Sequence, residues 1–189
     1  VRCVVGLAMF GLGITLFIRA DLGLAPWDVF HKGLSNKLDV SIGVVIIGVG
    51  LLLLLLWIPL RQKPGIGTIM NALEIGFTVD LLKPLIGEPH NIVARLALVA
   101  AALLSVALGS ALYIGAALGP GPRDGLMLGL AARGVSVRFA RTAVEATTLV
   151  GGVLLGGTVG IGTVAFMLGI GPLVQVLLPR FDIRPPESR

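Results

Sequence analysis

The sequence predicts an all-helical protein that spans a membrane several times and is built from two related halves. Hydrophobic residues make up 56% of the chain, charged residues only 13%, and the mean hydropathy is +0.99. A soluble domain typically carries about 25% charged residues. So little polar surface could not cover a globule in water. The apolar residues also fall into long runs, and parts of the first half recur in the second.

Six apolar runs are long enough to be considered as spanning helices, each of which needs about 20 residues. They cover residues 4–18, 41–60, 65–86, 92–118, 139–155 and 160–178. Residues 27–38 and 125–134 are shorter. A twelve-residue helix reaches about 18 Å, which is too short for a core of about 30 Å. We therefore predict that each short segment is a re-entrant or interfacial half-helix.

A sequence frame precedes each short segment. Ala-x-Leu-Gly-x-x-Pro-x-Asp occurs at 20–28 and again at 116–124. Residues 11–23 match 107–119 at seven of thirteen positions, and residues 64–82 match 159–177 at nine of nineteen. Because the matched Gly, Pro, Asp and Thr residues keep their order, we infer a duplication. Residues 1–90 form the first predicted membrane repeat, 91–180 the second, and 181–189 a cytoplasmic tail.

The number of spans decides how the repeats are oriented. Three spans in each half place the halves in opposite orientations, which is the inverted-repeat plan of many secondary transporters. If the short segments also span, each half has four helices, and the repeats are parallel. Charge bias puts both termini in the cytoplasm under either topology. With six spans, ten basic residues lie on the N-terminal side and five on the other; with eight, the division is eleven to four. Segment length favours six.

Several functional classes find no support in the sequence. Cys3 is the only cysteine, so a disulfide framework or a cysteine metal cluster is excluded. His31 and His90 are far apart, and we expect no metal and no cofactor. No nucleophile–base pattern predicts an enzyme. The basic residues stand singly near the ends of apolar runs, which indicates membrane topology rather than nucleic-acid binding. The first apolar run leads directly into the repeated frame, so we expect no cleavable signal peptide.

Paired acidic residues are the first candidates for a binding site. Asp28 and Asp124 occupy the same place in the two frames. They either bind a cation, proton or amine, or they stabilise the start of a short helix. His31 follows Asp28 by three residues and could relay a proton. Asp80, matched by Gln175 in the repeat, lies near the end of a predicted span and suits a structural hydrogen bond.

Two further candidates lie inside predicted spans. Glu74 has Asn71 three residues before it on the same helical face, and its repeat counterpart is Gly169. An ionisable residue within a span indicates a functional site by default; the alternative is a buried Glu that is paired or protonated. Arg141 and Glu145 are four residues apart and can pair on one helix. They either neutralise each other or anchor an anionic substrate.

The motifs resemble those of the YczE/YitT-like family of bacterial integral membrane proteins. The resemblance rests on residues 19–28 (Arg-Ala-Asp-Leu-Gly-x-x-Pro-Trp-Asp), 64–68 (Pro-Gly-Ile-Gly-Thr) and 169–175 (Gly-Ile-Gly-Pro-Leu-Val-Gln). It implies a multi-pass protein of the bacterial inner membrane, in a largely uncharacterised family whose relatives are grouped with small-molecule exporters.

The expected function is secondary transport of a small molecule coupled to protons or cations. The alternative is a membrane partner or regulatory subunit that does not transport. The expected partners are the lipid bilayer, a small-molecule or ion substrate, and a second copy of the chain docked through Gly- and Ala-rich helix faces.

Overall fold

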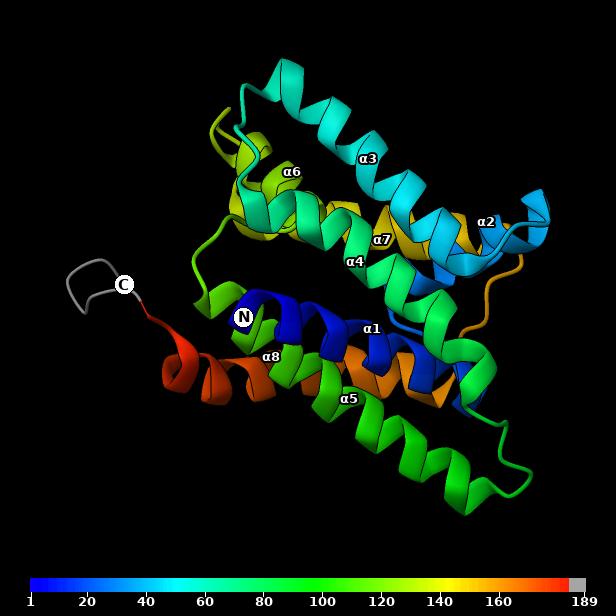
Figure 1. Ribbon diagram of the computed structural model, residues 1–189. Helices are drawn as coiled ribbons and strands as arrows, with labels where there is room; N and C mark the ends of the chain where they lie inside the picture. The colour runs from blue at the N-terminus through cyan, green and yellow to red at the C-terminus, as the bar shows by residue number, and fades with distance from the viewer. Residues whose placement is uncertain (184–189) are drawn as a thin grey trace.

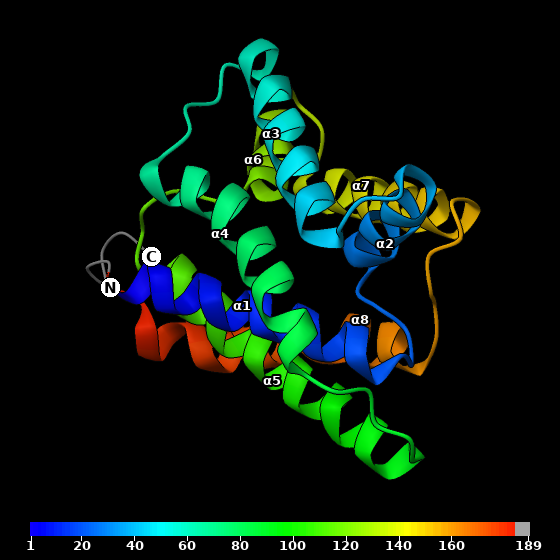
Figure 2. The ribbon, with the colours of Figure 1, turned by 45° about the vertical axis from the view of Figure 1, so that its right-hand side comes forward.

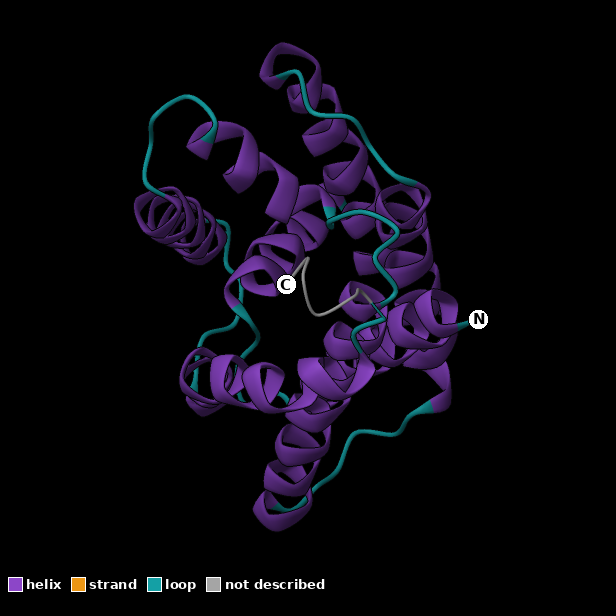
Figure 3. Cartoon of the chain, turned by 90° about the vertical axis from the view of Figure 1, so that its left-hand side faces the viewer, coloured by secondary structure: helices purple, strands orange, loops and turns teal. Residues whose placement is uncertain are grey.

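The computed structural model describes residues 1–183, which form α-helices, one short 3-10 helix and connecting loops, with no strand. Figure 3 shows this chain of helices and loops. The elements are α1 (Arg2–Ala20), α2 (Pro26–Leu38), α3 (Ile42–Leu60), α4 (Ile66–Leu82), η1 (Lys83–Leu85), α5 (Ile92–Gly115), α6 (Pro122–Ala131), α7 (Val137–Leu154) and α8 (Ile161–Phe181). The predicted tail at 181–189 begins inside α8, and residues 184–189 lie outside the described part of the chain.

The exterior of the helices is apolar. Leu52 is 61% exposed, Phe77 65% and Leu168 73%, and apolar patches of this extent suit lipid rather than water. Four helices, α1, α3, α5 and α8, are long and apolar enough to cross a membrane. Two of the six predicted spans fall short of that standard, because α4 has 17 residues and α7 carries several charged side chains. The chain is therefore an all-α membrane protein with four clear candidate spans.

The helices form two layers. Figures 1 and 2 show α1, α5 and α8 in one layer and α2, α3, α6 and α7 in the other. Helix α4 connects the layers, because it packs against both α1 and α3. The short helices predicted at 27–38 and 125–134 are present as α2 and α6, each shifted to begin at the proline of its frame.

Helices α1 and α5 make the most extensive contact in the structure and run antiparallel. Gly6 lies against Gly109 and Tyr113, while Gly13 lies against Ala102 and Val106. The residue numbers of the α5 contacts therefore fall as those in α1 rise, which means that the helices run in opposite directions. A Cβ atom on Gly6 would lie 2.7 Å from the backbone nitrogen of Tyr113. Small residues allow the two backbones to approach this closely. The small-residue face of α5 is thus occupied by α1 of the same chain.

Each repeated frame docks on a Gly-Ile-Gly-Thr segment from the other half. The backbone N–H of Gly162 donates to the carbonyl of Leu22 at 2.7 Å, and that of Gly67 donates to the carbonyl of Leu118 at 2.9 Å. The glycines that follow these leucines have φ angles of +106° and +117°, a region that glycine adopts without steric cost. Gly65 and Gly160, which open the two Gly-Ile-Gly-Thr segments, pack equally closely: an added Cβ atom would clash with the carbonyl oxygen of Leu118 in the first case and with that of Leu22 in the second.

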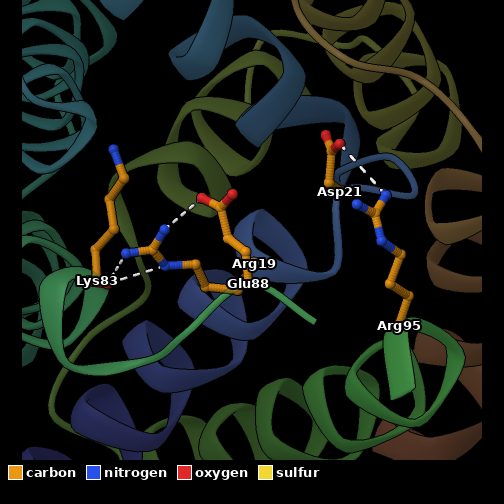
Figure 4. Close-up of polar contacts among 5 residues, drawn as sticks. All are labelled: Arg19, Asp21, Lys83, Glu88 and Arg95. Carbon is orange, nitrogen blue, oxygen red and sulfur yellow. Dashed lines mark hydrogen bonds and ion pairs between the residues drawn. The ribbon is translucent and has the colours of Figure 1, made fainter. Parts of the chain in front are cut away.

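One end of the structure is held by ion pairs and hydrogen bonds around the C-terminal end of α1 (Figure 4). Arg19 donates from Nε to the carbonyl oxygen of Lys83 at 2.9 Å and pairs with Glu88. Arg95 Nη1 lies 3.5 Å from Asp21 Oδ2. These contacts bring the C-terminal end of α4 and the N-terminal end of α5 to the same place.

The two ends of the described chain lie at the opposite end of the structure. The N–H of Ile183 donates to the carbonyl of Gly115, the last residue of α5, at 3.1 Å. Because α1 and α5 are antiparallel, this position is beside the start of α1. Figure 2 shows the N-terminus close to the C-terminal end of α8.

The two halves differ in how their last two long helices pack. Helices α3 and α4 cross in close contact at Gly43 and Gly76, and Asp80 accepts hydrogen bonds from Ser41 Oγ at 2.5 Å and Gly43 N at 3.0 Å. The structural role predicted for Asp80 is confirmed. Helices α7 and α8, by contrast, make hardly any contact within the described chain. Gly171, the counterpart of Gly76, would have nothing within 4 Å of an added Cβ atom.

Candidate functional site

The N-terminal ends of the two short helices face a pair of cavities. The first cavity has an empty volume of about 550 Å³ and is lined by residues of α2, α3, α4 and α6, with Phe10 and Ile14 from α1 and Tyr113 from α5. Its polar lining consists of Asp28, His31, Asn71, Tyr113, Arg123 and Asp124. The second cavity has an empty volume of about 640 Å³ and lies between α2, α6, α7 and α8. Its charged lining consists of Arg123, Asp124, Arg141 and Glu145.

Three side chains line both cavities: Trp27, Arg123 and Asp124. Trp27 follows Pro26 in the first frame, and Arg123 follows Pro122 in the second. These two positions correspond in the predicted repeat. The wall between the cavities therefore contains a position at which the two frames differ strongly in chemistry. The first frame has the indole of Trp27 there, and the second has the guanidinium of Arg123.

Asp28 lies in the first turn of α2 and is buried. Its Oδ1 is 3.2 Å from Nδ1 of His31, one turn further along the helix. The N-terminal cap of α2 is Ala25, and no side chain caps the helix with a hydrogen bond. The carboxylate therefore interacts favourably with the helix dipole, but it is not a hydrogen-bonding cap. It remains available, with His31, to the first cavity.

Asp124 has the same place in α6 but a different partner. Its Oδ2 accepts a hydrogen bond from the Tyr113 hydroxyl at 3.1 Å. The counterpart of Tyr113 in the first half is Phe17, which has no hydroxyl, and the counterpart of His31 is Met127. Each aspartate thus has one polar partner, supplied by its own helix in the first half and by α5 in the second.

The side chain of Arg123 packs against Phe10, a neighbour of Tyr113. The guanidinium carbon of Arg123 lies 5.6 Å from the ring centre of Phe10, and Phe10 packs edge-on against Tyr113 with ring centres 6.3 Å apart. A cation above an aromatic face is held by the ring quadrupole. Among the described residues, Arg123 makes no ion pair and no hydrogen bond.

The two tryptophans differ in how their N–H groups are satisfied. Trp57 donates to the carbonyl of Pro122 at 3.0 Å, which ties α3 to the start of α6. The indole nitrogen of Trp27 is buried and has no hydrogen-bond partner in the described chain. A buried donor without a partner costs free energy, so this side of the shared wall is held by packing alone.

The structure gathers most of the predicted site residues but not all of them. Asp28, His31, Asn71 and Asp124 line the first cavity. Glu74 is partly buried on α4, lines neither cavity, and makes no hydrogen bond or ion pair with a described residue.

Arg141 and Glu145 line the second cavity and form the predicted pair at 3.1 Å. Both side chains are more than a third exposed. This leaves the contribution of the pair to stability small.

Sequence reasoning missed Trp27, Tyr113 and Arg123 as lining residues. A signal for Arg123 was present, because aligning the two frames places it opposite Trp27 at the start of a half-helix. Within the described residues, no group of three or more His, Cys, Asp or Glu side chains could hold a metal ion.

Comparison with known proteins gives a family but no activity. The chain is 34% identical over 173 residues to an uncharacterised protein of Haemophilus influenzae, covering 91% of this chain and 79% of that one. It is 28% identical over 178 residues to the uncharacterised membrane protein YczE of Bacillus subtilis, covering 93% and 83%. It is 31% identical over 183 residues to the uncharacterised protein YyaS of the same organism, covering 93% and 90%.

No solved structure matches the chain. The resemblance to YczE predicted from the motifs is confirmed. Residues 1–179 match the model of a family of unknown function, DUF6198, and the chain belongs to that family.

Proposed function

We propose that the protein is a secondary transporter of a small molecule, coupled to protons or cations. The observation that carries the proposal is the pair of cavities that meet at one wall, formed by the N-terminal ends of two half-helices. Discontinuous helices that meet near the membrane midplane form the substrate sites of many secondary transporters. Fold-level analogy alone is weak evidence for function, and the weight here rests on the charged residues at that wall.

The proposed topology has six spans arranged as two inverted repeats. The antiparallel packing of α1 and α5, which correspond in the repeat, supports it. The long helices also alternate in direction: α4 begins beside Leu118 and ends beside Arg19, and α8 begins beside Leu22 and ends beside Gly115. In this topology α4 and α7 complete the six spans, with Asn71 of α4 and Arg141 and Glu145 of α7 lining the cavities.

The two cavities support an alternating-access cycle. Positions matched by the predicted repeat line the two cavities. Ile46, Gly50, Ala72 and Ile75 of the first cavity match, in that order, Arg141, Glu145, Met167 and Ile170 of the second. The first cavity is bounded by helices in close contact, and the second by helices that stand apart. We infer that the described conformation is one state of a pair and that its counterpart closes α7 on α8 and separates α3 from α4.

The coupling groups in this proposal are Asp28 and Asp124. Each lines the first cavity, and each has a hydrogen-bonding partner there, His31 for Asp28 and Tyr113 for Asp124. Glu74 has no role in the proposal, because it lies outside both cavities.

Transport is tested with purified protein in liposomes under an imposed proton or sodium gradient, using a broad panel of small solutes. We expect accumulation of at least one solute, and we expect Asp28→Asn and Asp124→Asn to reduce its initial rate at least tenfold. Glu74→Gln serves as the matched carboxylate control and is expected to retain the wild-type rate. If no solute moves across the whole panel, the transport proposal is wrong.

The topology is tested by cysteine accessibility in a Cys3→Ser background. Single cysteines at Lys32 and Arg133 are labelled from each side of the membrane with a reagent that does not cross it. We expect label from opposite sides, because the half-helices enter from opposite ends of the structure. Labelling of both positions from one side would contradict the inverted topology.

A further inference from the structure

The guanidinium of Arg123 is the starting point, because it lies at the shared wall and makes no hydrogen bond or close ion pair with a described residue. The other charged side chains in the cavities each have a hydrogen-bonding partner: Asp28 has His31, Asp124 has Tyr113, and Arg141 and Glu145 have each other. Arg123 packs against the ring of Phe10, while Asp124 and Asp28 attract its charge from further away. A cation inside a membrane protein is costly and is normally paired.

Arg123 is held in place rather than free to turn to water. It lies in the first turn of α6, whose start is tied to α3 by the hydrogen bond from Trp57 to the carbonyl of Pro122. The ring of Phe10 is in turn packed edge-on against Tyr113. The five N–H donors of a guanidinium form a rigid fork that fits a carboxylate. An anionic group entering either cavity meets this fork.

The first cavity also offers negative charge. Asp28 and Asp124 both line it, and each has only one of its carboxylate oxygens in a described hydrogen bond. The remaining oxygens accept hydrogen bonds from an ammonium group. Phe10, Ile14, Ile46, Ile75 and Trp27 provide apolar surface beside these groups. The cavity therefore combines one anion-binding group, two cation-binding groups and apolar walls.

We propose that the first cavity binds a small zwitterion, with its carboxylate on Arg123 and its ammonium group between Asp28 and Asp124. This names the substrate class of the proposed transporter and rests on that proposal for its physiological meaning. A zwitterion brings no net charge into the membrane interior, while each of its two charges finds an opposite charge already present. A simple anion would add a negative charge beside the two aspartates, and a simple cation would leave the guanidinium fork of Arg123 without a carboxylate in hydrogen-bonding reach.

The test is direct binding to purified wild-type protein by isothermal titration calorimetry. The probes are glycine, alanine, leucine and phenylalanine, each compared with the acid that lacks its amino group and the amine that lacks its carboxyl group. We expect at least one amino acid to bind with a Kd of about 1 mM or lower, and its two analogues to bind at least tenfold more weakly. Binding of an acid or an amine as tightly as the amino acid would overturn the assignment, as would no binding by any of the four.

Variants locate the site. Arg123→Gln is expected to weaken binding of the amino acid at least tenfold, with Arg123→Lys intermediate because an ammonium keeps the charge but loses the fork. Arg138→Gln removes an exposed arginine that lines neither cavity and is expected to bind as the wild type does. Equal affinity in Arg123→Gln and wild type contradicts the site, provided that both elute as the same species and melt at similar temperature.

Binding and flux separate the two proposals. If an amino acid binds through Arg123 but is not transported into liposomes, the binding site is supported and the transport proposal is wrong. If a solute is transported while no amino acid binds, transport is supported and the zwitterion proposal is wrong.

Discussion

In the first half of the chain α3 and α4 cross in contact, whereas in the second half α7 and α8 stand apart with a cavity between them. The sequence differs at the crossing: Gly43, which touches Gly76, corresponds to Arg138, and Asp80, which ties α4 to the start of α3, corresponds to Gln175. The comparison shows that segments matched by the predicted repeat can pack differently and that they differ in sequence at the contact. A predicted duplication therefore does not require equal structures.

The glycines at the two crossings give the largest expected contrast. Gly76→Ala places a Cβ atom 2.7 Å from Ile47 Cγ1 and closer still to the Gly43 backbone, and overpacking of this kind costs about 1–3 kcal/mol. Gly171→Ala meets nothing within 4 Å and gains helix propensity of up to about 1 kcal/mol. Thermal unfolding in detergent measures both. A similar loss of stability in the two variants would mean that α7 and α8 pack as α3 and α4 do.

The tryptophans should differ next. Trp57→Phe leaves the buried carbonyl of Pro122 without its donor, at a cost of about 1–3 kcal/mol. Trp27→Phe removes an N–H that has no partner, so relief of its desolvation offsets the lost packing, and we expect little net change. Denaturant unfolding followed by the remaining tryptophan measures each one. The comparison fails if Trp27→Phe proves the more damaging substitution.

The serine caps give the smallest contrast. Ser41 caps α3 and Ser136 caps α7, each accepting a hydrogen bond from a backbone N–H at 3.2 Å. Ser136→Ala is expected to cost about 1 kcal/mol, as for an ordinary cap. Ser41 also donates to Asp80, so Ser41→Ala should cost about 1 kcal/mol more. The difference should disappear in an Asp80→Asn background, and a difference that persists there must have another cause.

Much of the local structure could be predicted from the sequence. The two short helices follow from residue type, because the Gly and Pro residues of each frame interrupt the preceding helix, although the structure begins each helix earlier than predicted, at its proline. The packing between helices could not be predicted in this way. Periodicity identified the polar residues of α4, but only the structure shows that Asn71 lines a cavity and Glu74 does not. Counting basic residues on each side of the membrane treats every one of them as a surface residue, whereas the structure places Arg123 in the lining of both cavities.

The reciprocal docking of the two frames has a consequence for synthesis. The carbonyl of Leu22 accepts its hydrogen bond from the N–H of Gly162, which lies 140 residues later in the chain (162 minus 22). At roughly 5–20 residues per second, a ribosome needs on the order of ten seconds to supply that donor. The first frame therefore completes its docking only after the start of α8 has been synthesised.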